Sequence, residues 1–156
     1  MLIRPASPED IPRILILERQ AQQAAHWPEG KYREIFNCPV PTRFVLVIEQ
    51  ESSVQGFGIL RVIDQESEIE NVVVADGSRR QGWGIQLLRR SIELARNMGA
   101  ITLFLEVRDS NLPARALYNR SGLIESGRRK RYYTAPEEDA VLYRLALLDS
   151  SSSDDS

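Results

Sequence analysis

The sequence contains very little of the residue types on which several classes of protein depend. Cysteine and histidine each occur once in 156 residues, which excludes a disulfide framework, a thiolate zinc cluster and a histidine-rich metal site. The net charge of -2 lacks the basic excess of a general nucleic-acid binder. No apolar run is long enough to span a membrane, and the N-terminal "MLIRPASPED" meets a proline and charges too early for a signal peptide. We therefore expect a soluble, cytoplasmic protein that binds no metal, membrane or nucleic acid.

The remaining composition is typical of a globular domain, with 42% hydrophobic and 27% charged residues. The length allows one domain with a proper core and leaves little room for a second. The last eight residues, "DSSSSDDS", are too polar to pack. These features predict a single domain over residues 1–148 and a disordered tail over residues 149–156.

Hydrophobic patterning and turn residues divide the chain into alternating strands and helices. Ser7 as N-cap, Pro8 at the first helical position and Asp10 form a capping box before the first helix. A second short helix follows Pro28, a third follows the loop that begins near residue 76, and a fourth runs from about Asn111 to Gly122. Strands are predicted at residues 2–6, 43–50, 54–63, 67–75, 101–108, 123–133 and 139–148. This order predicts an α/β (α+β) fold with one mixed sheet of about seven strands and helices on both faces.

The loop "DGSRRQGWG" before the third helix has the features of an anion-binding site. Backbone N–H groups at a helix start lack partners and carry partial positive charge. Gly82 and Gly84 allow close approach to that backbone, and Arg79 and Arg80 add full charges. A Walker A loop needs Lys and Ser or Thr after the second glycine, where Ile85 and Gln86 stand, and a dinucleotide fingerprint needs a third glycine. The loop therefore predicts a phosphate or pyrophosphate ligand of another kind, against the alternative of a solvated basic helix start.

Two motifs resemble those of a known family. The pattern R-x-x-G-x-G of Arg79, Gly82 and Gly84 is similar to the pyrophosphate loop of the GNAT superfamily of N-acetyltransferases, which bind acetyl-CoA. The segment "LEVRDSNLPARALYNRSG" and the later "GRRKRYYTAPEEDAVLYRL" resemble the RimI branch, which acetylates protein N-termini, notably that of ribosomal protein S18. The resemblance covers nearly all of the chain to about Leu147, in element order as well as in motifs.

This resemblance implies the residues that hold acetyl-CoA. The strand before the loop supplies backbone partners to the pantetheine arm and the thioester, and one of its N–H groups is a candidate oxyanion donor. The loop wraps the pyrophosphate, and Asn111 contacts the cosubstrate. The implied set is Val72, Val73, Val74, Arg79, Arg80, Gln81, Gly82, Trp83, Gly84, Ile85 and Asn111.

Glu106 and Tyr118 are the candidate catalytic pair. Glu106 interrupts the apolar run "ITLFLEV" and matches the general base of the RimI branch. The alternative is that it only pairs with Arg108, two residues on and on the same strand face. Tyr118 is the candidate general acid, because a phenol with an ordinary pKa of about 10 can donate a proton to a departing thiolate. The alternative for Tyr118 is a core tyrosine on an apolar helix stripe.

Other residues are assigned to a reserve base and to the acceptor. Glu68 is a reserve base, against the alternative that Glu68 and Glu70 are solvated edge carboxylates. Tyr132 and Tyr133 are expected to wall the peptide groove and Trp27 to shape the acceptor entrance. His26 is better interpreted as a solvated loop residue, and Arg128 to Arg131 as a solvated strand end. The sequence "AHWPEG" departs from the branch's usual "PWS"-like sequence, which leaves the acceptor open.

The resulting hypothesis is direct acetyl transfer, in a ternary complex, to a protein N-terminus such as that of ribosomal protein S18. Cys38 lies outside the motifs, so nothing indicates an acyl-enzyme. Two alternatives remain at this point: the same fold acting on a polyamine, amino acid or drug, and a non-catalytic acyl-CoA sensor.

Overall fold

The computed structural model describes residues 1–21, 26–78, 82–134 and 136–148. Within this part of the chain the strands form one seven-stranded mixed sheet in the order β1-β2-β3-β4-β5-β7-β6. The strands are β1 (Leu2–Pro5), β2 (Arg43–Gln50), β3 (Ser53–Ile63), β4 (Glu66–Val74), β5 (Thr102–Arg108), β6 (Ile124–Thr134) and β7 (Glu137–Ala146). The helices are α1 (Ile11–Gln20), α2 (Glu29–Asn37), α3 (Trp83–Asn97) and α4 (Leu112–Arg120), with short 3-10 turns at Pro8–Asp10 and Asp76–Ser78. The predicted fold class and element order are confirmed.

The chain forms two compact units. One comprises residues 1–61 and 69–91, and the other residues 62–68 and 92 onwards.

No helix within the described residues is long and apolar enough to cross a membrane. The predictions of a single domain over residues 1–148 and of a disordered tail are not tested, and the tail lies outside the described residues.

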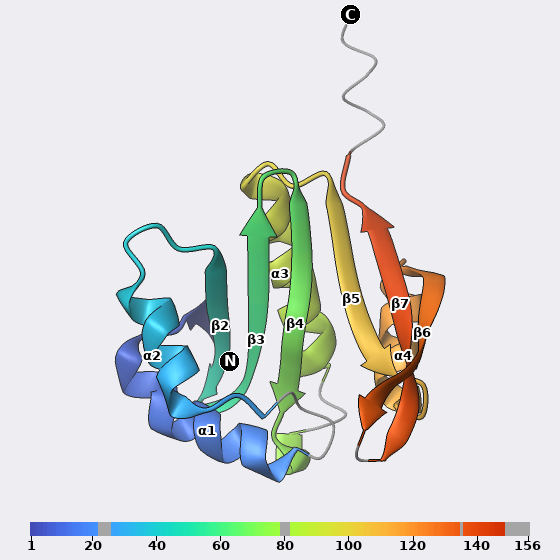
Figure 1. Ribbon diagram of the computed structural model, residues 1–156. Helices are drawn as coiled ribbons and strands as arrows, with labels where there is room; N and C mark the ends of the chain where they lie inside the picture. The colour runs from blue at the N-terminus through green and yellow to red at the C-terminus, as the bar shows by residue number, and fades with distance from the viewer. Residues whose placement is uncertain (22–25, 79–81, 135, 149–156) are drawn as a thin grey trace, which may run out of the picture. The chain divides into compact units, whose positions relative to one another are not determined.

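The first unit is a sheet covered by helices on both faces (Figure 1). β1 pairs with β2, and β2 with β3, in antiparallel register. On one face, α1 and α2 bury Ile14, Leu17 and Tyr32 against a cluster that includes Val47 and Phe57. On the other face lies the first part of α3, because a Cβ placed on Gly58 would lie 3.7 Å from the Ser91 hydroxyl. Apolar burial on both faces is the main force that holds this unit together.

The predicted capping box forms at the start of the first helix. The Asp10 carboxylate accepts the Ser7 N–H at 2.8 Å, and it also binds the Arg4 guanidinium of β1 through two contacts of 2.8 and 3.0 Å. Arg4 holds the pKa of Asp10 below its usual range. One carboxylate therefore fixes the helix start and ties it to the first strand.

A buried carboxylate joins three elements of the first unit. Glu18 at the end of α1 is 1% exposed, and its Oε1 accepts the Tyr32 hydroxyl at 2.9 Å and the Asn71 side-chain amide at 3.1 Å. Burial, together with the Glu18 charge, raises the pKa of Tyr32 far above its usual value, so this phenol stays a donor. The network connects α1, α2 and β4 through two neutral donors to a buried carboxylate. Loss of either donor is costly because burying a charge without its hydrogen bonds is unfavourable.

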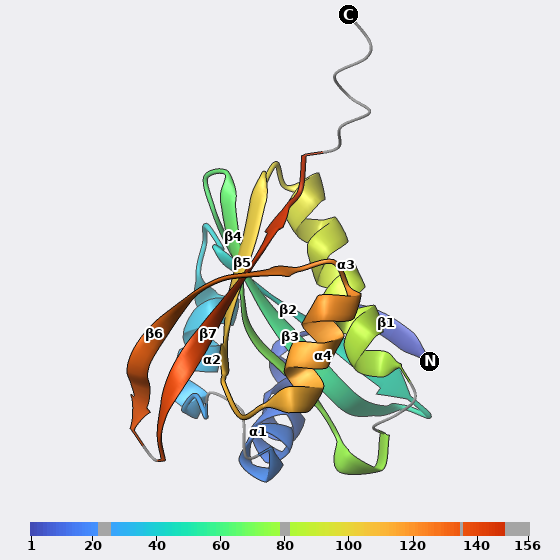
Figure 2. The same ribbon diagram turned by 90° about the vertical axis from the view of Figure 1, so that its right-hand side faces the viewer.

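The second unit is built on β5, β7 and β6, with α4 beside them (Figure 2). The β5–β7 register is unbroken from Thr102↔Ala146 to Arg108↔Ala140. The β6–β7 register has two irregularities, one between Glu125 and Gly127 and one between Arg129 and Tyr133. Arg115 of α4 donates to the Tyr143 hydroxyl of β7 at 3.2 Å, which attaches the helix to this sheet.

We predict that Tyr32→Phe destabilises the protein by about 1–3 kcal/mol, because the buried Glu18 carboxylate loses a hydrogen-bond donor. Urea unfolding at pH 7 measures this change. Tyr132→Phe is the matched control: Tyr132 is 50% exposed, and the same substitution there changes the free energy of unfolding by less than about 0.5 kcal/mol. Equal unfolding midpoints for the two variants contradict the role assigned to the Glu18 network.

Candidate active site

The predicted anion loop ends two residues earlier than its motif suggests. Gly82 has φ +76°, a backbone conformation that favours glycine, and α3 begins directly after it at Trp83. Gly84, expected in the loop, lies instead in the first turn of α3, because Trp83 is buried and starts the helix there. The Gln86 N–H of α3 donates to the Gly82 carbonyl at 3.2 Å. Arg79, Arg80 and Gln81 lie outside the described residues.

The three valines that are expected to bind acetyl-CoA end strand β4. Val73 is buried in the core of the first unit, and Val72 and Val74 are half-buried. The backbone there is approached closely by β3: a Cβ on Gly56 would lie 2.8 Å from the Val73 carbonyl oxygen. Only glycine at position 56 permits this approach without a shift, so the β3 sequence helps to set the position of the β4 backbone. The helix start at Gly82 and this valine strand belong to the same unit, and their contact with acetyl-CoA stays a prediction.

Glu106 pairs with an arginine, but not with the one that the sequence suggested. The Arg129 Nε lies 3.1 Å from Glu106 Oε1, and the Glu106 side chain is 21% exposed. The alternative pair with Arg108 is wrong, because Arg108 turns to Glu138 at 3.4 Å and to the Pro136 carbonyl at 3.2 Å. Arg129 follows Glu106 by 23 positions and reaches it from β6, a contact that no local pattern encodes.

Tyr118 is buried in α4, with 8% of its surface exposed. Its ring lies 5.6 Å from that of Tyr143, edge to face. Burial raises the pKa of Tyr118 to about 12, so it is a weaker acid than the ordinary phenol assumed from the sequence. The core-tyrosine alternative therefore describes its packing correctly, and its role as a general acid stays a prediction.

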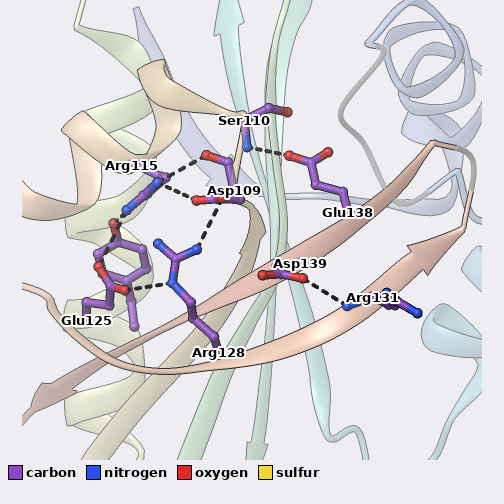
Figure 3. Close-up of polar contacts among 9 residues, drawn as sticks. Asp109, Ser110, Arg115, Glu125, Arg128, Arg131, Glu138 and Asp139 are labelled. Carbon is purple, nitrogen blue, oxygen red and sulfur yellow. Dashed lines mark hydrogen bonds and ion pairs between the residues drawn. The ribbon is translucent and has the colours of Figure 1, made fainter.

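The loop between Glu106 and Tyr118 is held by charges from three elements (Figure 3). Asp109 binds Arg115 of α4 at 2.7 Å and Arg128 of β6 at 3.1 Å. The Glu138 carboxylate of β7 accepts the Ser110 N–H. Hydrogen bonds from Ser110, with the Arg108 charge, hold the pKa of Glu138 below its usual range. These contacts fix the chain segment that joins the two candidate catalytic residues.

Asn111 follows this loop directly and has a structural task of its own. It is the N-cap of α4, and its Oδ1 accepts the Ala114 N–H at 3.3 Å. Its predicted contact with acetyl-CoA is not tested by this geometry. The cap explains in part why "SN" precedes a helix in this motif.

The paired tyrosines lie on the edge strand β6 of the second unit. Tyr132 is 50% exposed and Tyr133 half-buried, with their rings 5.2 Å apart, edge to face. The Arg108 guanidinium lies over the Tyr133 ring at 4.2 Å. Burial and the Glu106 charge raise the pKa of Tyr133. The second unit therefore brings Glu106, Arg129 and Tyr133 together.

The residues assigned to the acceptor entrance lie in the first unit. Trp27 packs against Tyr32 at 5.9 Å and has the Lys31 ammonium 3.6 Å from its ring centre. His26 is exposed, as expected for a loop histidine. Both line a cavity of about 360 Å³ together with Leu15, Glu18, Arg19, Pro28 and Glu29. The buried Glu18 in this lining was not recognised from the sequence, because at position 18 it falls at the end of an ordinary amphipathic pattern.

Strand β4 also contains Glu68, the reserve base, and Glu70, which the alternative placed beside it at the edge of the sheet. The edge-carboxylate alternative is wrong, since β4 lies inside the sheet. Glu70 binds Arg43 of β2 at 2.7 Å, with only 12% of its side chain exposed. Glu68 is half-buried and has an interaction partner. Its role as a reserve base stays a prediction.

The basic run at residues 128–131 is largely neutralised. Arg128 pairs with Asp109 and Glu125, Arg129 with Glu106, and Arg131 with Glu137 at 3.0 Å. The side chains stay exposed, as predicted, but their charges are matched by acidic neighbours. This pairing agrees with the small net charge of the chain.

Comparison with known proteins identifies the class of protein. Residues 12–123 match the model of the Acetyltransferase (GNAT) family. The chain belongs to this family and is an N-acetyltransferase.

Named relatives narrow the comparison. A putative ribosomal protein bS18-alanine N-acetyltransferase of Bacillus subtilis is 31% identical over 139 residues, covering 89% of this chain and 91% of that protein. The ribosomal protein bS18-alanine N-acetyltransferase of Escherichia coli K12 is 33% identical over 141 residues, with 88% and 92% covered. The crystal structure of the Escherichia coli ribosomal-protein-S18-alanine N-acetyltransferase has a TM-score of 0.82 at 29% identity, with 96% and 95% covered.

We predict that Glu138→Gln lowers the melting temperature at pH 7, because the Ser110 N–H and Arg108 lose a carboxylate partner. A carboxylate whose pKa is depressed in the folded state stabilises the protein above its unfolded pKa of about 4.3, and this contribution is lost as pH falls through the folded pKa. The difference between wild type and variant therefore narrows in melts from pH 7 down to about pH 3.

Glu137→Gln is the matched control, since Glu137 is 62% exposed and pairs with an Arg131 that is 82% exposed. It leaves the melting temperature at pH 7 nearly unchanged. A Glu138→Gln deficit that persists unchanged at pH 3 contradicts the role assigned to the charge.

Proposed function

We propose that this enzyme moves the acetyl group of acetyl-CoA to the α-amino group of a protein N-terminus, with ribosomal protein S18 as the leading acceptor. The observation that carries the proposal is identity of 31–33%, over nearly the whole chain, to enzymes named for that acceptor. A cytoplasmic location belongs to the same proposal, because ribosomal proteins are made and assembled there.

The cosubstrate is assigned to the first unit and to Asn111. The free N–H groups in the first turn of α3 carry partial positive charge, which suits the pyrophosphate. Arg79, Arg80 and Gln81 belong to the same loop by sequence. The backbone of Val72, Val73 and Val74 is assigned to the pantetheine arm, and an N–H group there to the thioester oxygen, on which negative charge grows during attack.

Two side chains of the second unit are assigned to the proton transfers. Glu106 takes a proton from the acceptor ammonium, which frees the amine nitrogen to attack the thioester carbonyl carbon. A carbon–nitrogen bond forms, the carbon–sulfur bond breaks, and Tyr118 supplies the proton for the departing sulfur. The nitrogen loses its second proton to solvent as the amide forms. Solvent then returns a proton to Tyr118 and removes one from Glu106. Direct attack requires no acyl-enzyme, and Cys38 lies outside these elements.

The acceptor peptide is assigned to Trp27 and to Tyr132 and Tyr133. Aromatic rings offer a broad apolar surface with polar tips, which suits an extended peptide. Acetylation of a small amine is not favoured, since the named relatives act on a protein. A non-catalytic sensor is not favoured either, since the chain belongs to a family of acetyltransferases.

We expect acetylation of a peptide that copies a bacterial S18 N-terminus, and none of the same peptide with a blocked α-amine. Mass spectrometry after incubation with acetyl-CoA measures both, with a polyamine mixture as a parallel acceptor. Acetylated polyamine with an untouched peptide overturns the acceptor assignment and leaves the acetyltransferase class in place.

We expect Glu106→Gln to lower kcat by roughly 10²–10⁴-fold, the range for loss of a general base, without weakening acetyl-CoA binding. Tyr118→Phe is expected to lower kcat in the same way, because it removes only the hydroxyl. Initial rates and calorimetric titration with acetyl-CoA separate the two effects. A Glu106→Gln variant with wild-type kcat refutes the assignment of the base.

A further inference from the structure

The Glu106–Arg129 ion pair crosses an intervening strand. β7 lies between β5 and β6 in the sheet, and neighbouring strands are about 4.8 Å apart. Glu106 stands opposite Leu142, and Arg129 opposite Ala140, on the same face of β7. A long side chain on β6 and a small residue, Ala140, opposite it allow the guanidinium to reach the carboxylate.

Within the described residues, the ion pair of Glu106 is made by Arg129. Arg108 shares the face of Glu106 but is engaged by Glu138, by the Pro136 carbonyl and by the Tyr133 ring. The ionisable neighbour from β6 besides Arg129 is Tyr133, whose pKa is raised in part by the Glu106 charge. Arg129 is therefore the cation that the fold assigns to this carboxylate.

The backbone that follows Arg129 is fixed by an irregularity in β6. The β6–β7 register shifts between Arg129 and Tyr133, and Arg131 has φ +54°. The Arg131 N–H donates to Asp139 Oδ1 at 3.0 Å, a contact drawn in Figure 3. A bulge of this kind redirects side chains and is common beside active sites. The Arg129 guanidinium, which pairs with Glu106, also has its carbon 5.5 Å from the centre of the Tyr132 ring.

The pair contributes little to stability. The Arg129 side chain is 56% exposed, and exposed ion pairs add little to the free energy of unfolding because solvent screens them. A guanidinium is always charged and presents its donors in a rigid plane, so it holds a carboxylate in one orientation at any physiological pH. An arginine that pairs with the candidate base therefore suits orientation better than structural support.

We propose that Arg129 is a positioning residue for Glu106, holding its carboxylate in the orientation needed to take a proton from the acceptor ammonium. It acts through Glu106 and not on the reacting atoms. Its place beside Tyr132 also puts it between the candidate base and the candidate peptide surface. The inference rests on the proposed function, in which Glu106 is the base.

The test compares Arg129→Gln, Arg129→Lys and Lys130→Gln in steady-state kinetics with the S18 peptide. Lys130 is the adjacent exposed cation, and its loss controls for charge on the same hairpin. We expect Arg129→Gln to lower kcat by roughly 10- to 100-fold, the scale for a misplaced catalytic group, with the KM for acetyl-CoA unchanged. Arg129→Lys keeps the charge but lacks the rigid plane of donors, so it restores only part of the loss, and Lys130→Gln stays within twofold of wild type.

A second measurement places Arg129→Gln in the Glu106→Gln background. If Arg129 acts through Glu106, the double variant is no slower than Glu106→Gln alone, because effects of residues that act as a unit do not add. A raised peptide KM with unchanged kcat overturns the proposal, as does a further loss in the double variant. Failure of the proposed function and failure of this inference give different results. If Glu106→Gln keeps the wild-type kcat, Glu106 is not the base and the proposed mechanism fails. If Glu106→Gln is slow but Arg129→Gln has a normal kcat, only the role assigned to Arg129 fails.

Discussion

The unbroken register between β5 and β7 is the constraint on which the candidate active site depends. Seven consecutive residue pairs fix which β5 side chains share a face. Shifting a strand by one residue turns every side chain to the other face, so a slip would take Glu106 away from Arg129 and Tyr133. Of the β5–β7 and β6–β7 pairings, the second contains the register shifts. The unit thus combines a regularly paired strand that carries the candidate base with an irregularly paired edge strand that carries the cation and the tyrosines.

Local signals were sufficient for the order of helices and strands along the chain. Ser7, Pro8 and Asp10 predicted the first helix start, and the capping box formed as expected. The prolines and glycines between apolar runs predicted the order of elements. These features act over three or four residues, so a single sequence contains the information needed to recognise them. Gly84 is the exception: its motif suggested a loop, but it lies in the first turn of α3, which begins at the buried Trp83.

Long-range charge pairing could not be predicted in the same way. The sequence offered Arg108 as the partner of Glu106 because the two are close along one strand. The structure assigns Arg108 to Glu138 and brings Arg129 across β7 instead. Glu18 likewise finds Tyr32 and Asn71, which are 14 and 53 positions away. Such partners depend on strand order and register, which follow from the whole sheet and not from any segment.

The burial of Tyr118 limits how it can act on a leaving thiolate. Its pKa of about 12 means that the phenol keeps its proton throughout the physiological range, so a donor is always present. An alkyl thiol has a pKa of about 8.5, so transfer of the phenol proton to the departing sulfur is uphill and is completed when solvent returns a proton to Tyr118. Before that transfer, a hydrogen bond from the phenol stabilises the negative charge that grows on the sulfur, and it gains most in a poorly solvated site. The environment that weakens Tyr118 as an acid therefore strengthens it as a donor to developing charge, because both effects come from the exclusion of water around its ring.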